Sequence, residues 1–353
     1  MKDYQYPLDL DWTTEEMVIV TNMWTAVEQA NETGLPVDKF LTTYQQFKTV
    51  VKSIGEEKRL GHEFENASGY SLYRTLQQAK KQGSGKLKLG DDYMTETQKF
   101  IQTIQSWLFE AADVIRMNLE SELTVQQKNG RTDLVTNMDE QTQEFLMNKI
   151  QTNFPEDQIL GEEKGYNTLK SFAGRVWIID PIDGTMNFVM ERENFCIMLA
   201  VYEDGIGKLG FIYDVMREEL YWGGKGLGVY RNNQLLKAPT MKALADGLWG
   251  MNAYMHGKNI HHATEIGQAS MGVRISGCAG LEIIAMLKGN HHGYLSNISP
   301  WDYAAGLVLL EEFGFKYSGI TGKPLTFDGR EYFIAATPET YDEVFTRYLN
   351  ESE

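Results

Sequence analysis

The stretch Arg175-Val-Trp-Ile-Ile-Asp-Pro-Ile-Asp-Gly-Thr185 decides the fold at the middle of this chain. Its first five residues are typical of a strand, and two carboxylates follow within a turn. Pro181 cannot continue a strand ladder, and Gly184 permits a tight turn. Residues three apart in an extended strand face opposite sides of a sheet. Asp180 and Asp183 can therefore converge only if the backbone bends between them.

Such a bend would bring two carboxylates to one point. At about 4 Å and an effective dielectric constant near 20, they repel each other by roughly 4 kcal/mol. A buried pair of this kind requires a cation or a shared proton. We also expect Asp183 to cap a helix whose first amides, at Gly184 and Thr185, point at an anion. The alternative is a strand end with a capped turn and no ligand.

Three further acidic residues extend the pattern. Glu162 follows an apolar run at the end of a predicted strand, Asp139 lies where a helix should begin, and Asp302 lies in the first turn of a predicted helix at 301–313. Each also has a purely structural explanation. Asp139 can be an N-cap, Asp302 can complete a capping box with Ser299, and Glu162 can be a solvated surface charge. Together they favour a hard-cation site, because such sites combine several oxygen ligands.

Pattern and composition divide the chain into two parts and a linker. Residues 1–81 are predicted to be all helical, beginning with a capping box at Thr13 and Glu16 and continuing with apolar residues at helical spacing. Residues 82–92 are polar, contain glycine and lack periodicity, so we interpret them as a linker. Residues 93–353 form the larger part.

The larger part alternates strand and helix signals. Residues 195–231 predict a mostly antiparallel meander, since strand-like runs alternate there with turn signals. Further strands are expected at 273–276, 292–295 and 333–336, and helices at 280–288, 301–313 and 338–349. The pattern indicates mixed sheets layered with helices.

Charge and composition exclude several classes of protein. The chain has 353 residues, 42% of them hydrophobic, and a net charge of −16, which argues against sequence-independent binding to nucleic acid or anionic lipid. No run is long enough to span a membrane, and the first residues lack the features of a signal peptide. Cys196 and Cys278 lie far apart without a C-x-x-C spacing, which disfavours a disulfide framework. We expect a cytoplasmic protein.

Other catalytic motifs are not predicted. The histidines, at His256, His261-His262 and His291-His292, lack a helical i, i+4 zinc pair. The glycine-rich run Gly223–Gly228 lies between strand-like segments and is better explained as a hairpin turn than as a phosphate loop. No nucleophile elbow, Walker A or dinucleotide fingerprint occurs in a strand–helix context.

Three motifs carry a family resemblance. They are Gly161-Glu-Glu163, Trp177-Ile-Ile-Asp-Pro-Ile-Asp-Gly-Thr-Met-Asn-Phe188 and Trp301-Asp-Tyr-Ala-Ala-Gly306. In this order they resemble the signature of the inositol monophosphatase family, magnesium-dependent, lithium-sensitive phosphatases related to fructose bisphosphatase. The resemblance covers about residues 93–353. It implies an α+β fold, a layered α/β/α/β/α sandwich, usually dimeric, that hydrolyses small-molecule phosphate monoesters.

The resemblance also implies roles for the acids. Glu162, Asp180 and the carbonyl of Ile182 would hold one Mg²⁺. Asp180, Asp183 and Asp302 would hold a second, and a third, weaker ion would lie near Glu162. Paired metal ions neutralise charge on the transferred phosphate and lower the pKa of water, so no protein nucleophile is required.

The same resemblance implies which residues orient the attacking water and which contact the substrate. Thr185, paired with Asp139, would orient the attacking water. The residues expected on the substrate side are Gly184 and Thr185 through their amides, Lys128, and the segment of Gly277, Cys278 and Ala279. Cys278 is otherwise explained as a small buried hydrophobe.

One position departs from the family pattern. Many members carry a glutamate seven residues before the aspartate of the Trp-Asp motif, where it binds an inositol hydroxyl. Here that position is Leu295, or Ser296 if the alignment shifts by one, and neither supplies a carboxylate. NADP, other nucleotide phosphates and fructose bisphosphate are therefore alternative substrates to inositol phosphate.

The N-terminal helices resemble a small uncharacterised bacterial protein family. The likeness rests on Tyr6-Pro-Leu-Asp-Leu-Asp-Trp-Thr-Thr-Glu15 and Glu65-Asn-Ala-Ser-Gly-Tyr70. It implies no activity, and we interpret the segment as a docking module for a protein partner. Two alternatives stay open for the whole chain: a non-catalytic regulatory protein that keeps the phosphatase fold, and a helical module that recruits the phosphatase part to a partner.

Overall fold

The computed structural model describes residues 6–9, 11–89, 96–119, 123–130, 133–163 and 165–349. The chain divides into two compact units, Met1–Ser106 with Asn233–Leu235, and Trp107–Asn232 with Leu236–Glu353. Each unit is described by itself. None of the helices within the described ranges combines the length and apolarity that a membrane crossing requires.

The N-terminal unit is a helical bundle, as predicted. Its elements are α1 (Thr14–Glu32), α2 (Val37–Val50), α3 (Ile54–Ser68) and α4 (Leu72–Gln82), with a short antiparallel pair β1 (Leu35–Pro36) and β2 (Lys86–Leu87). The capping box of Thr13 and Glu16 is present. Trp24 centres the core, with its ring 4.8 Å from the ring of Phe64 and 5.5 Å from that of Phe47.

The segment predicted as a linker is partly structured. Strand β2 lies within it, and Leu87 is fully buried among the apolar side chains of the helical bundle. Residues 86–89 therefore pack as part of this unit. Residues 90–95 lie outside the described residues.

The second unit is built on two sheets. The larger contains β5 (Gln158–Gly161), β6 (Arg175–Asp183), β7 (Cys196–Glu203), β8 (Ile206–Asp214), β9 (Glu219–Gly224) and β10 (Gly228–Arg231) in spatial sequence, with the short β11 (Gln234–Leu235) at its edge. Strands β5 and β6 run parallel, whereas β6 to β10 pair antiparallel, so the meander expected at 195–231 is confirmed. The smaller sheet has the order β13 (Gly272–Arg274), β12 (Leu248–Met251), β14 (His291–Ile298), β16 (Glu331–Ala336), β15 (Lys316–Gly319).

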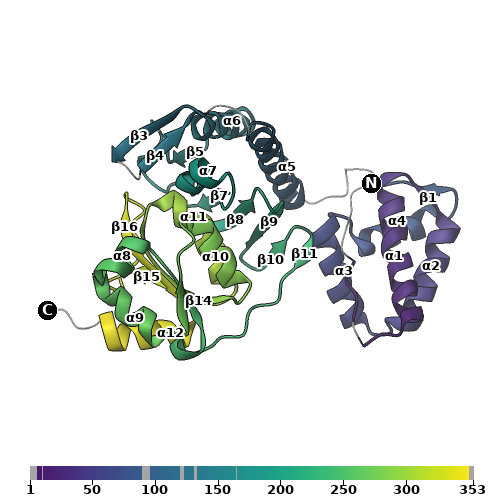
Figure 1. The fold of residues 1–353 in the computed structure, drawn as a ribbon. Coiled ribbons are helices and arrows are strands. Elements are labelled where there is room, and N and C mark those ends of the chain that lie inside the picture. The colour runs from purple at the N-terminus through teal and green to yellow at the C-terminus, as the bar shows by residue number, and fades with distance from the viewer. Residues whose placement is uncertain are drawn as a thin grey trace. The chain divides into compact units, whose positions relative to one another are not determined.

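Helices form the remaining layers. Helices α10 (Ala279–Leu287) and α11 (Pro300–Glu312) lie between the two sheets (Figure 1). Helix α6 (Asn137–Asn153) and the part of α5 (Glu96–Met117) from Trp107 onward belong to the outer face of the larger sheet. Helices α8 (Ala253–Lys258), α9 (Ala263–Ala269) and α12 (Pro338–Val344) belong to the outer face of the smaller one. Short elements complete the unit: the hairpin β3 (Val125–Gly130) and β4 (Asp133–Thr136), α7 (Thr185–Glu191), and the turns Leu244–Asp246, Ile260–His262 and Phe345–Leu349. The α/β/α/β/α layering that the family resemblance implies is confirmed.

Successive side chains of β6 point to opposite faces of the larger sheet, and each face packs against a different layer. Val176 and Ile178 belong to the core shared with α10 and α11. Trp177 points the other way, where its ring lies 5.5 Å from that of Phe154 and 6.1 Å from that of Trp107. A strand buried on both faces needs apolar residues at every position, which explains the continuous apolar run.

Helix α11 packs so closely on β8 that one position admits no side chain. A Cβ atom at Gly210 would lie 2.3 Å from the backbone oxygen of Ala305. We predict that Gly210→Ala destabilises the second unit by about 1–3 kcal/mol, because neither backbone can move away without disturbing its sheet or helix. Gly257→Ala in α8 is the matched control, since nothing lies within 4 Å of its Cβ position. Urea unfolding followed by tryptophan fluorescence checks both; equal stability of the two variants would contradict the packing described.

Candidate metal and active site

A register shift in β6 brings two aspartates to one side of the sheet. Asp180 pairs with Met198 and Asp183 pairs with Cys196, so β6 carries one extra residue across this interval. Such a bulge bends the strand and tolerates the proline that lies within it. Cys196 and Met198 both belong to the core that contains α10 and α11. Asp180 and Asp183 therefore face the same layer, as the sequence required.

Asp302 joins them from a different element. It is the third residue of α11, and the capping box with Ser299 is present, with Pro300 opening the helix. The amide of Ser299 donates to Oδ2 of Asp302 over 2.8 Å. Ligand oxygens of Asp180, Asp183 and Asp302 all lie within 4.8 Å of one another. The capping role and the cluster coexist, because a carboxylate has two oxygens.

Glu162 approaches the cluster from the end of β5. Its amide donates to the carbonyl of Ile179 over 3.3 Å, which fixes the chain beside β6. The residue lines the same cavity as Asp180, and its charge is among the groups that raise the pKa of Asp180. Glu162 is thus a member of the site and not an isolated surface charge.

Asp139 and Thr185 form a hydrogen-bonded pair. Thr185 Oγ1 lies 3.0 Å from Oδ1 of Asp139 and 3.0 Å from the carbonyl oxygen of Ile182. Asp139 is fully buried, and its other oxygen accepts from the amide of Thr136 over 2.8 Å in a capping box at the start of α6. Helix α6 and the β6 turn together fix the hydroxyl of Thr185.

The expectation that Asp183 caps the helix opened by Gly184 and Thr185 is wrong. Gly184 is itself the N-cap of α7, with φ of 88°, and no side chain caps that helix. Asp183 instead accepts from the amide of Ala279 over 3.1 Å and from that of Gly280, at the start of α10. The physical reason is the strand register, which points this carboxylate into the layer that contains α10.

Cys278 completes the environment of Asp183. Its thiol lies 3.0 Å from Oδ2 of Asp183, and burial raises the pKa of the thiol well above its ordinary value, so the sulfur keeps its proton and donates. A Cβ atom at Gly184 would lie 3.0 Å from the Cβ atom of Cys278. Positive φ and this close approach both require glycine at 184.

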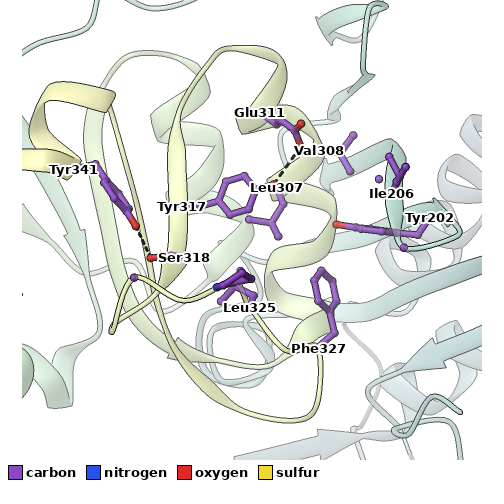
Figure 2. A pocket seen from close by; sticks show the side chains of 14 residues that line it. Tyr202, Ile206, Leu307, Val308, Glu311, Tyr317, Ser318, Leu325, Phe327 and Tyr341 are labelled. Carbon is purple, nitrogen blue, oxygen red and sulfur yellow. Dashed lines mark hydrogen bonds between the residues drawn. The ribbon is translucent and has the colours of Figure 1, made fainter. Parts of the chain in front are cut away.

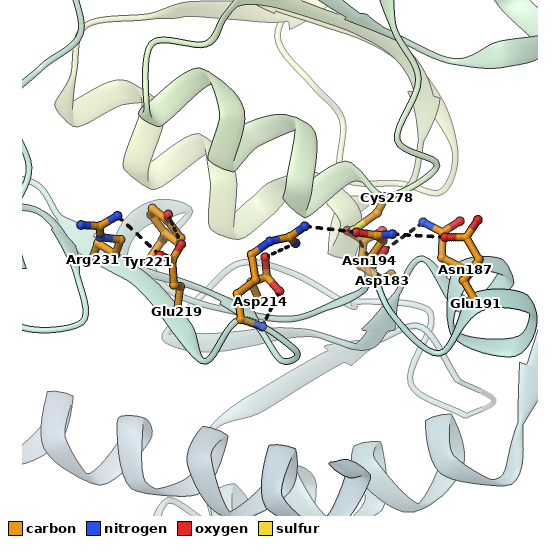
Figure 3. A network of polar contacts seen from close by, with 10 residues as sticks. Asp183, Asn187, Glu191, Asn194, Asp214, Glu219, Tyr221, Arg231 and Cys278 are labelled. Carbon is orange, nitrogen blue, oxygen red and sulfur yellow. Dashed lines mark hydrogen bonds and ion pairs between the residues drawn. The ribbon is translucent and has the colours of Figure 1, made fainter. Parts of the chain in front are cut away.

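A polar network fixes α7 against the segment before α10. Asn187 Nδ2 donates to the carbonyl of Asn194 over 2.9 Å and to that of Ser276 over 2.8 Å. Figure 3 shows Asn187 beside Asn194, with Asp183 and Cys278 close by. Arg217 extends the network, donating to Asp214 over 2.8 Å and to Asn194 over 3.4 Å. The loop between α7 and β7 is therefore fastened on two sides.

The electrostatics of the cluster demand positive charge. Burial first, and then the charges of Glu162, Asp183 and Asp302, raise the pKa of Asp180 well above its ordinary value. Burial and Asp302 raise the pKa of Asp183 to about 7, although the thiol of Cys278 and the amides at the start of α10 oppose the rise. Asp180 and Asp183 are only 1% and 7% exposed, so water cannot screen their repulsion.

The donor set fits Mg²⁺. Every candidate ligand is a carboxylate or carbonyl oxygen, which magnesium prefers. The thiol of Cys278 beside Asp183 stays protonated, because burial raises its pKa. A divalent ion at this position would replace carboxylate repulsion by attraction. The chemistry of the residues present therefore agrees with the metal-dependent family that they resemble.

The cluster forms the floor of a cavity of about 450 Å³. Gly184, Thr185, Gly277, Cys278 and Ala279, all expected on the substrate side, line it. Lys128 was also expected there; it belongs to β3, and its side chain lies outside the described residues.

The two positions considered for the family's glutamate face opposite sides of β14. Leu295 is fully buried in the core on the outer face of the smaller sheet. Ser296 lines the cavity. Neither residue supplies a carboxylate to the site.

Several cavity residues have no counterpart in the sequence motifs. Glu282, Tyr254, Asn297 and Arg330 all line the cavity. Glu282 holds the substrate-side segment, because its Oε1 accepts from the amide of Ser276 over 2.8 Å. Its position at the fourth residue of α10 is the only signal for it, whereas Arg330 comes from the start of β16 with no local signature.

A second cavity, of about 480 Å³, lies beside the C-terminal half of α11. Figure 2 shows it lined by Tyr202, Tyr317, Tyr341 and Leu307 among others. Its hydroxyl groups are paired internally: Tyr317 with Glu311 over 3.2 Å, and Tyr341 with Ser318 over 2.5 Å. Glu311 is its one carboxylate, so of these two cavities the first holds the chemistry.

The helical unit matches an uncharacterised family. Residues 3–88 match the family model described as uncharacterised protein family UPF0223. A UPF0223 protein of Enterococcus faecalis is 99% identical over 92 residues, which cover 26% of this chain and all of that protein.

The second unit matches phosphatases. The inositol-1-monophosphatase of Bacillus subtilis is 37% identical over 266 residues, which cover 73% of this chain and 99% of that protein. The fructose-1,6-bisphosphatase/inositol-1-monophosphatase of Thermotoga maritima is 31% identical over 230 residues, 64% of this chain and 86% of that protein. Two solved structures of an IMPase/NADP phosphatase, one with Mg²⁺ and phosphate and one with NADP and Ca²⁺, are each 31% identical with a TM-score of 0.66, covering 71% of this chain and 95% of theirs.

These matches agree with the layered sheets and the acidic cluster of the second unit. Residues 96–353 match the family model described as the inositol monophosphatase family. The chain belongs to the inositol monophosphatase family.

Proposed function

We propose that this protein hydrolyses a small-molecule phosphate monoester with the acidic cluster as its Mg²⁺ site. The observation that carries the proposal is the convergence of Asp180, Asp183 and Asp302 within 4.8 Å beside a fixed threonine hydroxyl. A structural role alone would not gather unscreened carboxylates, because their repulsion destabilises the fold.

The metal ligands are proposed as follows. Glu162, Asp180 and the carbonyl of Ile182 hold one Mg²⁺, and Asp180, Asp183 and Asp302 hold a second; a third ion would lie near Glu162. Bound there, Mg²⁺ neutralises charge on the phosphate, lowers the pKa of water and stabilises the leaving alkoxide. The amides at the start of α10 keep one face of Asp183 occupied, which orients its remaining lone pairs towards the cluster.

Thr185 and Asp139 position the attacking water. The threonine hydroxyl donates its hydrogen to Asp139 or to the carbonyl of Ile182, and therefore presents its lone pairs to a water molecule in the cavity. The buried carboxylate of Asp139 is held by α6 and can receive a proton through the hydroxyl. The water attacks phosphorus directly as the ester P–O bond breaks, so no phosphoenzyme forms.

The phosphate group is proposed to lie against the amides of Gly184 and Thr185. Both residues line the cavity, and Gly184, with φ of 88°, opens α7 there. Gly277, Cys278 and Ala279 form the facing wall and contact the alcohol part of the substrate. Lys128 remains a proposed contact from the β3 strand.

The substrate class is open among three candidates named by the relatives. They are inositol monophosphates, fructose 1,6-bisphosphate and NADP. Phosphate release from each, measured with Mg²⁺, with EDTA and with Mg²⁺ plus lithium, tests the proposal. Magnesium-dependent, lithium-inhibited release supports it. A folded protein that binds Mg²⁺ and releases no phosphate from any of them would instead be the non-catalytic regulatory protein.

The protein is further proposed to be a cytoplasmic homodimer. The support for the dimer is the family resemblance. The support for the cytoplasm is the spacing of Cys196 and Cys278, which disfavours a disulfide framework. The helical unit is proposed to dock a protein partner. The boundary between the two domains, expected at residues 82–92, is proposed to follow Leu89, since residues 86–89 pack with the helical bundle.

Replacing Asp180 by asparagine should separate activity from stability. The pKa values of Asp180 and Asp183 are raised in the folded protein, the latter from 3.8 to about 7, so the folded state holds protons more tightly than the unfolded state. Stability of the metal-free protein therefore falls as pH rises from about 4 to 7. Asp180→Asn removes one charge, so at pH 7.5 in EDTA the melting temperature should rise by at least ~2 °C.

The same variant should also lose the rise in melting temperature and the activity that depend on Mg²⁺. Wild-type protein should melt at a higher temperature with Mg²⁺ than with EDTA, because the ion binds only the folded state. In Asp180→Asn this difference should vanish together with phosphate release. A variant that melts lower than wild type in EDTA, or that keeps the Mg²⁺ shift, would contradict the assignment.

Thr185→Ala should lower kcat by about a hundredfold with little change in KM, since the hydroxyl acts on the water and not on the substrate. Thr185→Ser, which keeps the hydroxyl, is the matched control and should stay within about tenfold of wild type. Steady-state kinetics with saturating Mg²⁺ measures both. Equal kcat for the alanine and serine variants would remove Thr185 from the mechanism.

Deleting residues 1–89 should leave catalysis nearly unchanged. The described residues that line the cavity all lie between Leu134 and Arg330, and none of them belongs to the helical unit. We expect kcat/KM within about twofold of the full chain. A soluble, folded truncation without activity would show that the helical unit contributes to the site or its assembly.

A further inference from the structure

The helical unit contains a groove of about 820 Å³ between α3 and α4, larger than the cavity of the acidic cluster. Its described lining residues lie between Tyr44 and Lys80, so it shares no residue with the acidic cluster. Side chains about one helical turn apart form its walls: Ile54, Lys58, Gly61 and Glu65 on α3, and Leu72, Leu76 and Lys80 on α4.

A glycine in the middle of α3 leaves space in this groove. Gly61 lies at the centre of a helix of 15 residues, where glycine is less stabilising than alanine. Packing within the bundle does not require it, because a Cβ atom at Gly61 would lie 3.8 Å from the Cβ atom of Leu72, an ordinary contact distance. Room for an occupant of the groove explains the glycine better than the packing of the two helices does.

The groove has a buried apolar floor and exposed apolar side chains above it. Leu72 and Leu76 are only 2% and 4% exposed, whereas Ile54 on α3 and Tyr73 on α4 are 71% and 70% exposed. A small molecule on the floor would leave both large side chains in water. A protein segment that lies along the groove would cover them, and tyrosine is enriched where protein surfaces meet.

The acids of the groove are already engaged within the helical unit. Glu57 accepts from the hydroxyl of Tyr44 over 2.8 Å and pairs with Lys48 over 2.7 Å. Glu65 pairs with Arg74 over 3.7 Å. These carboxylates therefore have little charge left to offer a basic partner.

The lysines of the groove are exposed and unneutralised. Arg59 pairs with Glu63 over 2.8 Å, but Lys58 and Lys80 form no ion pair with any described residue. Residues 54–89 contain seven lysine and arginine residues and only four acids, although the chain as a whole carries a net charge of −16. The part of the chain that forms this groove is therefore locally basic and complementary to an acidic partner.

We infer that the groove between α3 and α4 binds an acidic amphipathic helix of a partner protein. The apolar face of that helix packs on Leu72, Leu76 and Tyr73, and its carboxylates meet Lys58 and Lys80. Helix α3 is about 22 Å long, enough to contact four turns of a bound helix. A nucleic acid fits less well, because its row of phosphates needs more free cations than two. The inference specifies the docking role proposed for the helical unit and is independent of the acidic cluster.

Three fluorescently labelled synthetic peptides of about 16 residues test the inference on the full chain. The first is an amphipathic helix with leucine on one face and glutamate beside it; the second has lysine in place of glutamate, and the third is a scramble of the first. Fluorescence anisotropy should give the first peptide a Kd on the order of tens of micromolar, at least about tenfold below those of the other two. Its affinity should fall as salt is added.

Variants of the groove should weaken binding of the acidic peptide. Lys80→Glu, Tyr73→Ala and Gly61→Leu should each raise Kd by about tenfold, because they reverse a charge, remove an apolar contact and fill the groove. Lys81→Glu is the matched control, since Lys81 is the exposed neighbour of Lys80 on α4 and does not line the groove. It should bind within about twofold of wild type, and melting temperatures verify that every variant is folded.

The outcomes distinguish the groove from other occupants and from the phosphatase. No binding of the acidic peptide, equal binding of the lysine peptide, or equal effects of Lys80→Glu and Lys81→Glu would overturn the inference. Tighter binding of a labelled single-stranded RNA would assign the groove to nucleic acid. A lower oligomeric state of Lys80→Glu alone, measured by sedimentation, would assign it to a second copy of this chain; both results overturn the inference. Phosphate release by the same preparations reports separately on the proposed function.

Discussion

The register shift in β6 is the constraint on which the site depends. In a regular strand Asp183 would face α5 and α6, together with Trp177. One extra residue turns it into the layer that contains α10 and α11, beside Asp180. The bulge thus creates the cluster and also an electrostatic cost, since two buried carboxylates repel each other at short range. This repulsion lowers the stability of the fold, and it also makes the cluster a binding site for cations.

The surrounding elements compensate for that repulsion in two ways. Asp183 receives amides from the start of α10 and the thiol of Cys278, and Asp302 receives the amide of Ser299 at the start of α11. Both middle-layer helices therefore direct their N-terminal ends at the cluster, where helix dipoles favour negative charge. These bonds lower the pKa of Asp183 but do not return it to its ordinary value. A bound metal ion would offset the carboxylate repulsion that these hydrogen bonds leave uncompensated.

Much of this arrangement could be predicted from the sequence, and the failures have physical causes. The period of two in strands required a bend between Asp180 and Asp183, and the Ser299–Asp302 spacing gave a capping box. The capping partner of Asp183 was predicted wrongly, because local sequence favours the next helix whereas the register selects α10. Hairpin β3–β4 and strand β12 were not predicted: the first is largely polar and the second spans only Leu248–Met251, too short to show a period. Arg330 was missed because only the pairing of β16 with β14 brings it to Asn297.

Binding of two cations at the end of β6 is the central claim, and anomalous scattering from Mn²⁺ tests it most directly. Crystals soaked in Mn²⁺, which shares the oxygen preference of Mg²⁺, should show one peak among Asp180, Asp183 and Asp302 and another between Asp180 and Glu162. A map with no peak at these carboxylates, or with manganese bound only elsewhere on the acidic surface, would contradict the account.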